Sequence, residues 1–309
     1  MNDYLSLLLG IASAGVGGEL FVRGAVGLAH WARISPGIIG ATVAAFATSS
    51  PELSVSVNSA LVGSPKIALG DALGSNVVNI ALILALALVI SGIQSPRDSI
   101  KRDFPVALLV PVVTGVLFLD GILSSADGAL MLSLFLAWLA AAVVEARKQR
   151  SSAENVLGVR HHWVALMSGV VGLVFLVAAG DLIVAGARGI AISFGIDEFI
   201  IGATIVAVGT SAPELATTVI AKLRGHDEVA LGTILGSNIF NGLLIIGIAA
   251  TIHPIVVSWR EVTVTLVFGL LALAVSWPPR SGFIERRRGI LLLALYAVYL
   301  ASILQGQAA

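Results

Sequence analysis

The chain has 309 residues, of which 57% are hydrophobic and only 12% are charged, and its mean hydropathy is +1.00. A water-soluble domain could not bury so much apolar surface, so the composition indicates a polytopic helical membrane protein. The 18 basic and 18 acidic residues cancel, which argues against a nucleic-acid partner, and the absence of cysteine excludes disulfides and cysteine-metal sites.

Apolar runs of spanning length predict ten transmembrane helices, arranged as five and then five. The first begins at the N-terminus, which lacks the basic segment of a cleaved signal peptide. A polar linker at 147–161 separates a first half, 1–146, from a second half, 162–309. The predicted spans lie near residues 4–30, 36–62, 67–93, 104–120, 125–146, 162–192, 198–222, 228–253, 260–278 and 289–306.

Lysine and arginine are distributed unevenly over the predicted loops. The odd-numbered loops carry 14 of the 18 basic residues, and the even-numbered loops carry three. Because loops rich in basic residues stay in the cytoplasm, we expect both termini on the extracytoplasmic side of the cell membrane. Five helices per half make the second half enter the membrane from the opposite side. We therefore expect an all-α membrane fold of two inverted-topology five-helix repeats.

One segment of the chain occurs twice. Residues 40–79 and 202–241 align without a gap at an offset of 162, and 20 of the 40 paired positions are identical. Each copy places one glutamate, Glu52 or Glu214, inside an apolar run. A buried charge of this kind costs roughly 2.5–3.5 kcal/mol, so two at equivalent positions indicate function rather than packing. The doubled acidic motif is typical of a transporter built from two halves.

The residues around each glutamate supply oxygen atoms. Pro51 and Pro213 lack an amide hydrogen, so the carbonyls of Ala47 and Gly209 lose their helical donors and can face a cation. Carboxylate, hydroxyl, amide and backbone oxygens, without histidine or cysteine, suit a hard cation such as Ca²⁺ better than zinc or copper. The next span in each half adds a serine and an asparagine four residues apart on one helix face, namely Ser75 with Asn79 and Ser237 with Asn241.

Two further acidic residues are not part of the symmetric pair of glutamates. Glu19 can form an ion pair with Arg23 one helical turn later, or it can line an ion pathway. Asp71 has Thr233 as its counterpart in the second copy. We therefore interpret Asp71 as a helix-end or vestibule charge outside the symmetric site.

Both copies resemble the α-repeats of the cation/Ca²⁺ exchanger superfamily. Their TSxPE and GSNxxN motifs are similar to those of the Na⁺/Ca²⁺ exchanger family, especially its compact prokaryotic members. The resemblance implies four cation sites near the membrane midplane, between the two broken helices and the helices that follow them. It also implies that the first and sixth helices slide across this core to open either side.

The resemblance gives each motif residue a role. Glu52 and Glu214 would be shared ligands of Ca²⁺ and Na⁺, so the two ions would compete. Asn79 and Asn241 would flank the central site. The other implied ligands offer hydroxyl or backbone oxygens and are Thr48, Thr210, Ser49, Ser211, Ala45, Ala207, Ser75 and Ser237.

The resemblance implies a secondary antiporter, not an enzyme, that exchanges Na⁺ for Ca²⁺ by alternating access. The transported ions are its substrates, and we expect no cofactor and no obligate protein partner besides the lipid bilayer. Some relatives, K⁺-dependent exchangers among them, have Asp where this chain has Asn241, so we expect exchange without K⁺. A Ca²⁺/H⁺ or other divalent cation/proton antiporter is the main alternative. A cation channel fits less well, because it needs a continuous pore.

Overall fold

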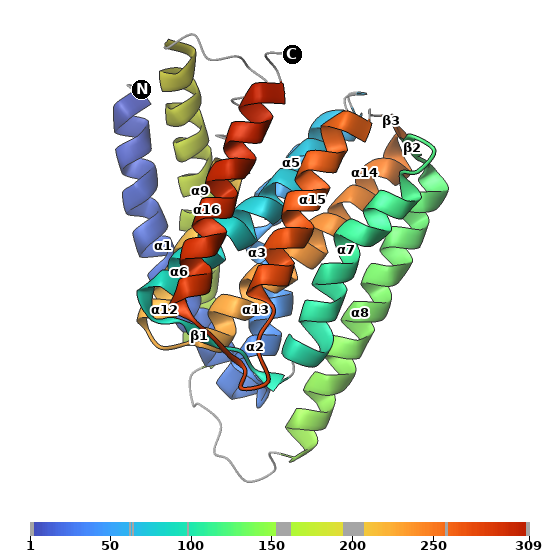
Figure 1. Ribbon diagram of the computed structural model, residues 1–309. Coiled ribbons are helices and arrows are strands. Elements are labelled where there is room, and N and C mark those ends of the chain that lie inside the picture. Colours follow the sequence, from blue (N-terminus) through green and yellow to red (C-terminus); the bar gives the residue numbers. More distant parts are fainter. Residues whose placement is uncertain are drawn as a thin grey trace.

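The computed structural model describes residues 3–61, 63, 65–97, 99–152, 162–193, 207–256 and 259–306 as a bundle of helices (Figure 1). The predicted helical, membrane-type fold is confirmed. Counting two helices bent by 46° around Ser49 as one span raises the number of described helices long and apolar enough to cross a bilayer from four to five. The four are Asp3–Ala32, Ala68–Ser91, Ser125–Lys148 and Asp227–Ile252.

The first half consists of helices interrupted by three π-helical segments, which are labelled η. The long helix α8 continues to Ser152, beyond the predicted boundary at 146, and residues 153–161 of the predicted linker lie outside the described part. The elements are α1 (Asp3–Ala32), α2 (Pro36–Ile39), η1 (Gly40–Ala44), α3 (Ala45–Thr48), α4 (Ser50–Leu61), α5 (Pro65–Val77), η2 (Val78–Leu84), α6 (Ala85–Ser91), β1 (Ile93–Gln94), η3 (Ser99–Asp103), α7 (Phe104–Leu117), β2 (Ile122–Leu123) and α8 (Ser125–Ser152).

The second half repeats much of this order. Residues 194–206, which include the start of the span predicted at 198–222, lie outside the described part. The elements are α9 (His162–Ser193), α11 (Ala207–Thr210), α12 (Ala212–Leu223), α13 (Asp227–Ile239), η5 (Phe240–Ile245), α14 (Ile246–Ile252), β3 (Ile255–Val256), α15 (Trp259–Ser276), β4 (Phe283–Ile284) and α16 (Arg286–Gly306). The start of α1 and the end of α16 lie at the same end of the bundle (Figure 1).

Each copy of the repeated motif breaks a helical path. The break in the first copy is at Ser49, with φ −84° and ψ 11°, between α3 and α4. The break in the second copy is at Ser211, with φ −82° and ψ 8°, between α11 and α12. Pro51 and Pro213 each occupy the second position of the new helix, where the missing amide hydrogen has no intrahelical partner to lose. The motif therefore starts a helix directly beside each glutamate.

The sequence predicts that the carbonyl of Ala47 is free to face a cation, but the structure shows this carbonyl hydrogen-bonded. In an unbroken helix the amide of residue 51 would donate to this carbonyl, but here the hydroxyl of Ser50 donates to it at 2.7 Å. The carbonyl is thus satisfied within the protein and needs no cation. The second copy has Ala212 in place of Ser50, so the carbonyl of Gly209 cannot receive the equivalent hydrogen bond.

The two halves are joined by two short antiparallel strand pairs. β1 pairs with β4, and β2 pairs with β3, so each pair takes one strand from each half. β1 and β3 begin 162 residues apart, which makes them equivalent under the repeat offset. The β1–β4 pair and the β2–β3 pair lie at opposite ends of the bundle (Figure 1). The contacts between the halves are therefore reciprocal.

Helices α1 and α9 approach each other closely through glycines. A β-carbon on Gly24 would lie 2.5 Å from the α-carbon of Gly169. A β-carbon on Gly172 would lie 2.5 Å from the backbone nitrogen of Phe21. Real β-carbons do not tolerate such distances to backbone atoms, so only glycine permits this packing. The result is a contact of two smooth backbone surfaces.

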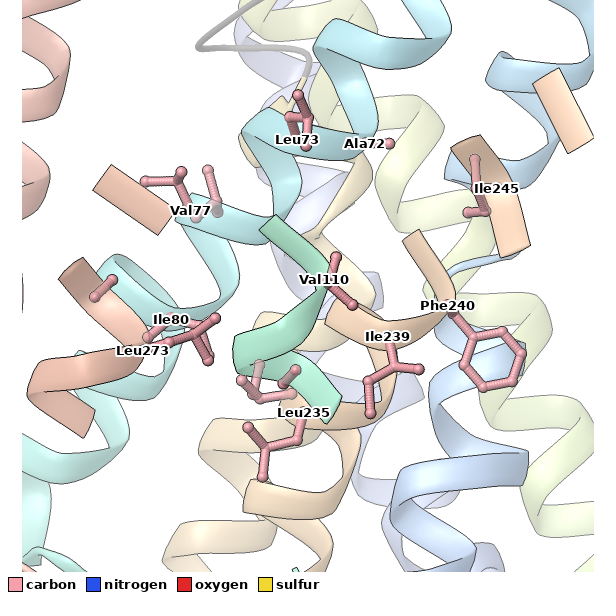
Figure 2. Close-up of a cluster of buried hydrophobic side chains, with 14 of the residues drawn as sticks. Ala72, Leu73, Val77, Ile80, Val110, Leu235, Ile239, Phe240, Ile245 and Leu273 are labelled. Carbon is pink, nitrogen blue, oxygen red and sulfur yellow. The ribbon is translucent and has the colours of Figure 1, made fainter. Parts of the chain in front are cut away.

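The hydrophobic core lies between the helices that follow the two breaks. Figure 2 shows side chains of α5 and η2, such as Val77 and Ile80, in the same region as Leu235 and Ile239 of α13. Phe240 packs edge-on against Phe135 of α8, with ring centroids 4.9 Å apart. The core thus spans both halves and holds the repeated motifs together.

Candidate cation site

Glu52 and Glu214 occupy equivalent places in the two halves. Each lies one residue after the motif proline, in the first turn of the helix that begins at the break. Both side chains have no exposed surface. The partial positive charge at a helix N-terminus favours a carboxylate in this turn. Oε2 of each glutamate has no hydrogen-bond partner among the described residues, so one oxygen of each remains for another ligand.

The serines at the two breaks cross over between the halves. The hydroxyl of Ser49 donates to Oε1 of Glu214 at 2.9 Å, and that of Ser211 donates to Oε1 of Glu52 at 3.3 Å. Since each hydroxyl reaches the glutamate of the other half, both glutamates belong to one buried cluster. The sequence placed these four residues on the repeated motif but did not predict this exchange of partners.

The helices after the breaks bring further oxygens to the cluster. The hydroxyl of Ser237 donates to Oε1 of Glu214 at 3.1 Å. Its counterpart Ser75 is buried, and its hydroxyl has no partner in the described part of the chain. The side-chain amides of Asn79 and Asn241 are also fully buried and make no hydrogen bond to described residues. Buried polar atoms without partners are costly, so these groups indicate a place built for ions or water.

Both of these asparagines lie in π-helical segments, Asn79 in η2 and Asn241 in η5. A π-helical turn is rare and frequently occurs at functional sites, because it displaces residues from the regular helical face. The spacing of four residues from Ser75 and Ser237 predicted a shared α-helical face. The wider turn begins between each serine and its asparagine and changes that relation.

A second pair of asparagines links the helices that follow the breaks. Nδ2 of Asn76 donates to the carbonyl of Asn238 at 3.2 Å, and Nδ2 of Asn238 donates to the carbonyl of Asn76 at 3.1 Å. The two residues are 162 positions apart, so the contact is between equivalent positions of the two copies. This reciprocal pair was not predicted. It holds α5 and α13 together at equivalent positions of the two copies.

The two motif threonines turn their hydroxyls toward backbone carbonyls. Oγ1 of Thr48 lies 3.0 Å from the carbonyl oxygen of Ala44 and 3.3 Å from that of Ala45, and Oγ1 of Thr210 lies 3.2 Å from that of Ala207. The carbonyls of Ala45 and Ala207 are the equivalent pair. The same carbonyls each accept a backbone amide at the break. A hydroxyl and a carbonyl oxygen therefore lie together beside each break, which is the kind of pair that the resemblance assigns to a cation.

The structure contradicts the interpretation of Asp71 as a helix-end or vestibule charge. It lies in the middle of α5, is only 6% exposed, and accepts a hydrogen bond at Oδ1 from the hydroxyl of Thr210 at 3.4 Å. The internal repeat did not indicate this position, because the counterpart of Asp71 in the second copy, Thr233, is uncharged. A carboxylate inside an apolar span was itself a sufficient signal.

Glu19 forms the predicted ion pair with Arg23, at 2.6 Å. It also binds Arg224, at 2.6 Å, in the turn between α12 and α13. This second partner was not predicted, since the two residues are 205 positions apart. Together with His226 these side chains line a pocket of about 340 Å³. The ion pairs give Glu19 a structural role between α1 and the second half.

The donor set of the buried cluster restricts the ions that it can hold. In the described residues, no three side chains of His, Cys, Asp or Glu gather closely enough to bind a metal by themselves. A cation here must therefore combine carboxylates with hydroxyl, amide and carbonyl oxygens. Such mixed oxygen sites suit Ca²⁺ and other hard cations, while nitrogen- or sulfur-preferring metals lack ligands.

The match to known proteins covers almost the whole chain. A profile of the family described as sodium/calcium exchanger protein matches residues 3–144 and 164–305. The chain belongs to this family. The exchanger is 37% identical to CaxA of Alkalimonas amylolytica in an alignment of length 299 that covers 91% of this chain and 92% of the relative. It is 29% identical to the sodium/calcium exchanger MaX1 of Methanosarcina acetivorans, with 96% of this chain and 97% of MaX1 covered.

Solved structures of the sodium-calcium exchanger NCX_Mj have the same fold. One of them, soaked with Na⁺ and Sr²⁺, superposes with a TM-score of 0.83 at 32% identity and covers 97% of this chain and 98% of its own. The exchanger is therefore a multi-pass membrane transporter of the cation/Ca²⁺ antiporter type, and its family indicates transport rather than catalysis. The predicted membership of the compact prokaryotic type is confirmed.

Proposed function

We propose that this exchanger moves Ca²⁺ across the cell membrane in exchange for Na⁺, by alternating access and without K⁺. The observation that carries the proposal is the single buried cluster in which Ser49 reaches Glu214 and Ser211 reaches Glu52. Two carboxylates balance one Ca²⁺, and the same carboxylates can instead hold Na⁺. One ion must then leave before the other binds, which is the requirement for exchange.

The proposed ligands are the residues that the resemblance assigns. Glu52 and Glu214 bind both ions, Asn79 and Asn241 flank the central position, and the remaining oxygens come from the breaks and from the helices that follow them. The support for this set is the burial of these residues and the unpartnered oxygens of both glutamates. The remaining ligands are Thr48, Thr210, Ser49, Ser211, Ala45, Ala207, Ser75 and Ser237.

The proposed architecture is ten transmembrane helices in two inverted five-helix repeats, 1–146 and 162–309, joined by a cytoplasmic linker at 147–161. Both termini would face the extracytoplasmic side. The reciprocal strand pairs and the crossed serines support an arrangement related by a pseudo-two-fold axis. Cysteines placed singly in the linker and at each terminus of this cysteine-free chain would test it. Labelling of the linker by an impermeant thiol reagent added outside intact cells would contradict the orientation.

Independence from K⁺ depends on the carboxylates of the cluster. The repeated motif contributes two carboxylates, Glu52 and Glu214, because Asn241 is neutral. Asp71 brings a third carboxylate to the cluster. We still propose exchange without K⁺, because Asn241 replaces the Asp found in K⁺-dependent relatives, and because Na⁺ can balance Asp71.

The test is uptake of ⁴⁵Ca²⁺ into liposomes that contain the purified exchanger. An outward Na⁺ gradient is compared with a pH gradient, in media in which K⁺ or choline is the other cation. We expect uptake to follow the Na⁺ gradient equally in both media. Uptake that follows only the pH gradient would instead establish the Ca²⁺/H⁺ antiporter. Uptake that stops when choline replaces K⁺ would refute independence from K⁺.

A further inference from the structure

The buried cluster is asymmetric in charge. Asp71 and Thr233 occupy equivalent positions of α5 and α13, and both are buried, at 6% and 0% exposure. Only Asp71 can carry a charge. The other ligand positions described above have matching residue types in the two halves. One end of the cluster therefore has a carboxylate that the other end lacks.

Among the described residues, the surroundings of Asp71 contain oxygen atoms and no counter-charge. Oδ1 accepts a hydrogen bond from the hydroxyl of Thr210, while Oδ2 has no hydrogen-bond partner in the part of the chain that the structure describes. Among the described residues, no lysine, arginine or histidine forms an ion pair with Asp71. A buried carboxylate oxygen without a partner is costly, and a cation is the ligand that removes most of this cost. The unpartnered oxygen thus points to an ion that belongs there.

Thr210 joins Asp71 to the rest of the cluster. Its hydroxyl lies 3.4 Å from Asp71 and 3.2 Å from the carbonyl oxygen of Ala207. Glu214 lies four residues further along the chain, beyond the break at Ser211, and its Oε2 also has no partner among the described residues. These groups place carboxylate, hydroxyl and carbonyl oxygens on one side of the central position. In the other half, the corresponding set of Thr233, Thr48 and Ala45 has no carboxylate.

We propose that Asp71 is a cation ligand, which together with Thr210 and the carbonyl of Ala207 binds one Na⁺ at one end of the cluster. This inference rests on the proposed Na⁺/Ca²⁺ exchange. One carboxylate matches the charge of one Na⁺, whereas Ca²⁺ draws on the two glutamates at the centre. Asp71 therefore selects for the Na⁺-loaded form of the exchanger. It also brings the number of carboxylates to three, which equals the charge of three Na⁺.

The test compares matched substitutions in the two halves. In Asp71→Asn the carboxylate is lost and the amide keeps the shape, and Thr233→Asn changes the equivalent position without adding charge. For each variant in liposomes, the half-saturating concentrations of Na⁺ and Ca²⁺ are measured from ⁴⁵Ca²⁺ flux. We expect Asp71→Asn to raise the value for Na⁺ about tenfold and the value for Ca²⁺ less than about twofold, because one charged ligand is lost. Thr233→Asn should change both values less than about twofold.

Two results would overturn the proposal. One is an unchanged Na⁺ value in a folded Asp71→Asn variant, and the other is an equal rise in the values for Na⁺ and Ca²⁺. Asp71→Glu keeps the charge, so it should retain Na⁺ affinity closer to wild type even if Asp71→Asn fails to fold. If K⁺ stimulates the wild type but not Asp71→Asn, the bound ion is K⁺ and not Na⁺. Wild-type protein without Na⁺-driven uptake would refute the exchange itself, which separates that failure from failure of the Asp71 site.

Discussion

Ser49 of the first half donates a hydrogen bond to Glu214 of the second half, over 2.9 Å between fully buried groups. Ser211 makes the equivalent bond to Glu52 at 3.3 Å. Each half therefore supplies a hydrogen-bond donor to the acid of the other half. The site is a property of the pair of repeats, since neither repeat alone contains a complete set of partners.

The paired glutamates should be individually indispensable. We expect Glu52→Gln or Glu214→Gln to lower Na⁺-driven Ca²⁺ uptake at least about tenfold, because each variant removes one of the two carboxylates that bind Ca²⁺ at the buried centre, and Asp71 lies at one end of the cluster. The measurement is initial ⁴⁵Ca²⁺ uptake into liposomes at equal protein density. Glu285→Gln is the control, because the side chain of Glu285 is 45% exposed, and it should keep wild-type uptake. Near-normal uptake in a folded variant of either buried glutamate would refute the shared-ligand model.

The crossed serines should contribute less than the glutamates do. We expect Ser49→Ala and Ser211→Ala to raise the half-saturating Ca²⁺ concentration about fivefold to thirtyfold, since each removes one hydrogen bond to a charged group and one oxygen. Ser133→Ala, on the exposed side of α8, is the control. The double variant tests the crossing, because the two serines serve different glutamates of one cluster. If both single variants match the wild type, the serines position nothing.

The repeat in the sequence indicated the common residues of the cluster, because the same residue types recur at equivalent positions of both copies. Glu52, Glu214 and the neighbouring serines lie together as one buried cluster, and the helical membrane fold follows from composition alone. Asp71 escaped the same reasoning because its counterpart carries no charge. Comparing the two copies therefore indicates residues that both halves share, but it does not indicate a residue such as Asp71 that only one half has.

Three other features could not be derived from the sequence for physical reasons. A π-helical turn such as η2 or η5 has no residue pattern of its own, since its extra residue is accommodated by tertiary packing. The two-residue strands β1 to β4 are too short for alternation to appear. The ion pair of Glu19 with Arg224 joins residues 205 positions apart and depends on how α1 packs.

The ion pair between Glu19 and Arg224 should make a small contribution to transport. We expect Glu19→Gln and Arg224→Gln each to change uptake by about threefold or less, because both side chains are partly exposed to solvent. The double variant should show no more than the larger single effect. The measurement is uptake at low and high ionic strength, and the effect should shrink as salt increases. A loss as large as that of Glu52→Gln would place Glu19 in the ion pathway.

The glycine contact between α1 and α9 should be sensitive to a single methyl group. We expect Gly24→Ala to slow uptake and to destabilise the protein by about 1–3 kcal/mol, because its β-carbon would collide with the backbone at Gly169. Gly15→Ala on the same helix is a matched control, since a β-carbon there meets nothing within 4 Å. Uptake and thermal unfolding are measured for both. Equal behaviour of the two variants would show that α1 does not need this close approach.

The reciprocal strand pairs have the pattern of an isologous contact, in which one surface meets a second copy of itself. A single half carries both kinds of strand, one for each pair. Two copies of an ancestral half, inserted in opposite orientations, would therefore form both pairs without a covalent link. Gene fusion would then have joined a homodimer that was already complete. Once fused, the copies could diverge one residue at a time, as the difference between Asp71 and Thr233 illustrates.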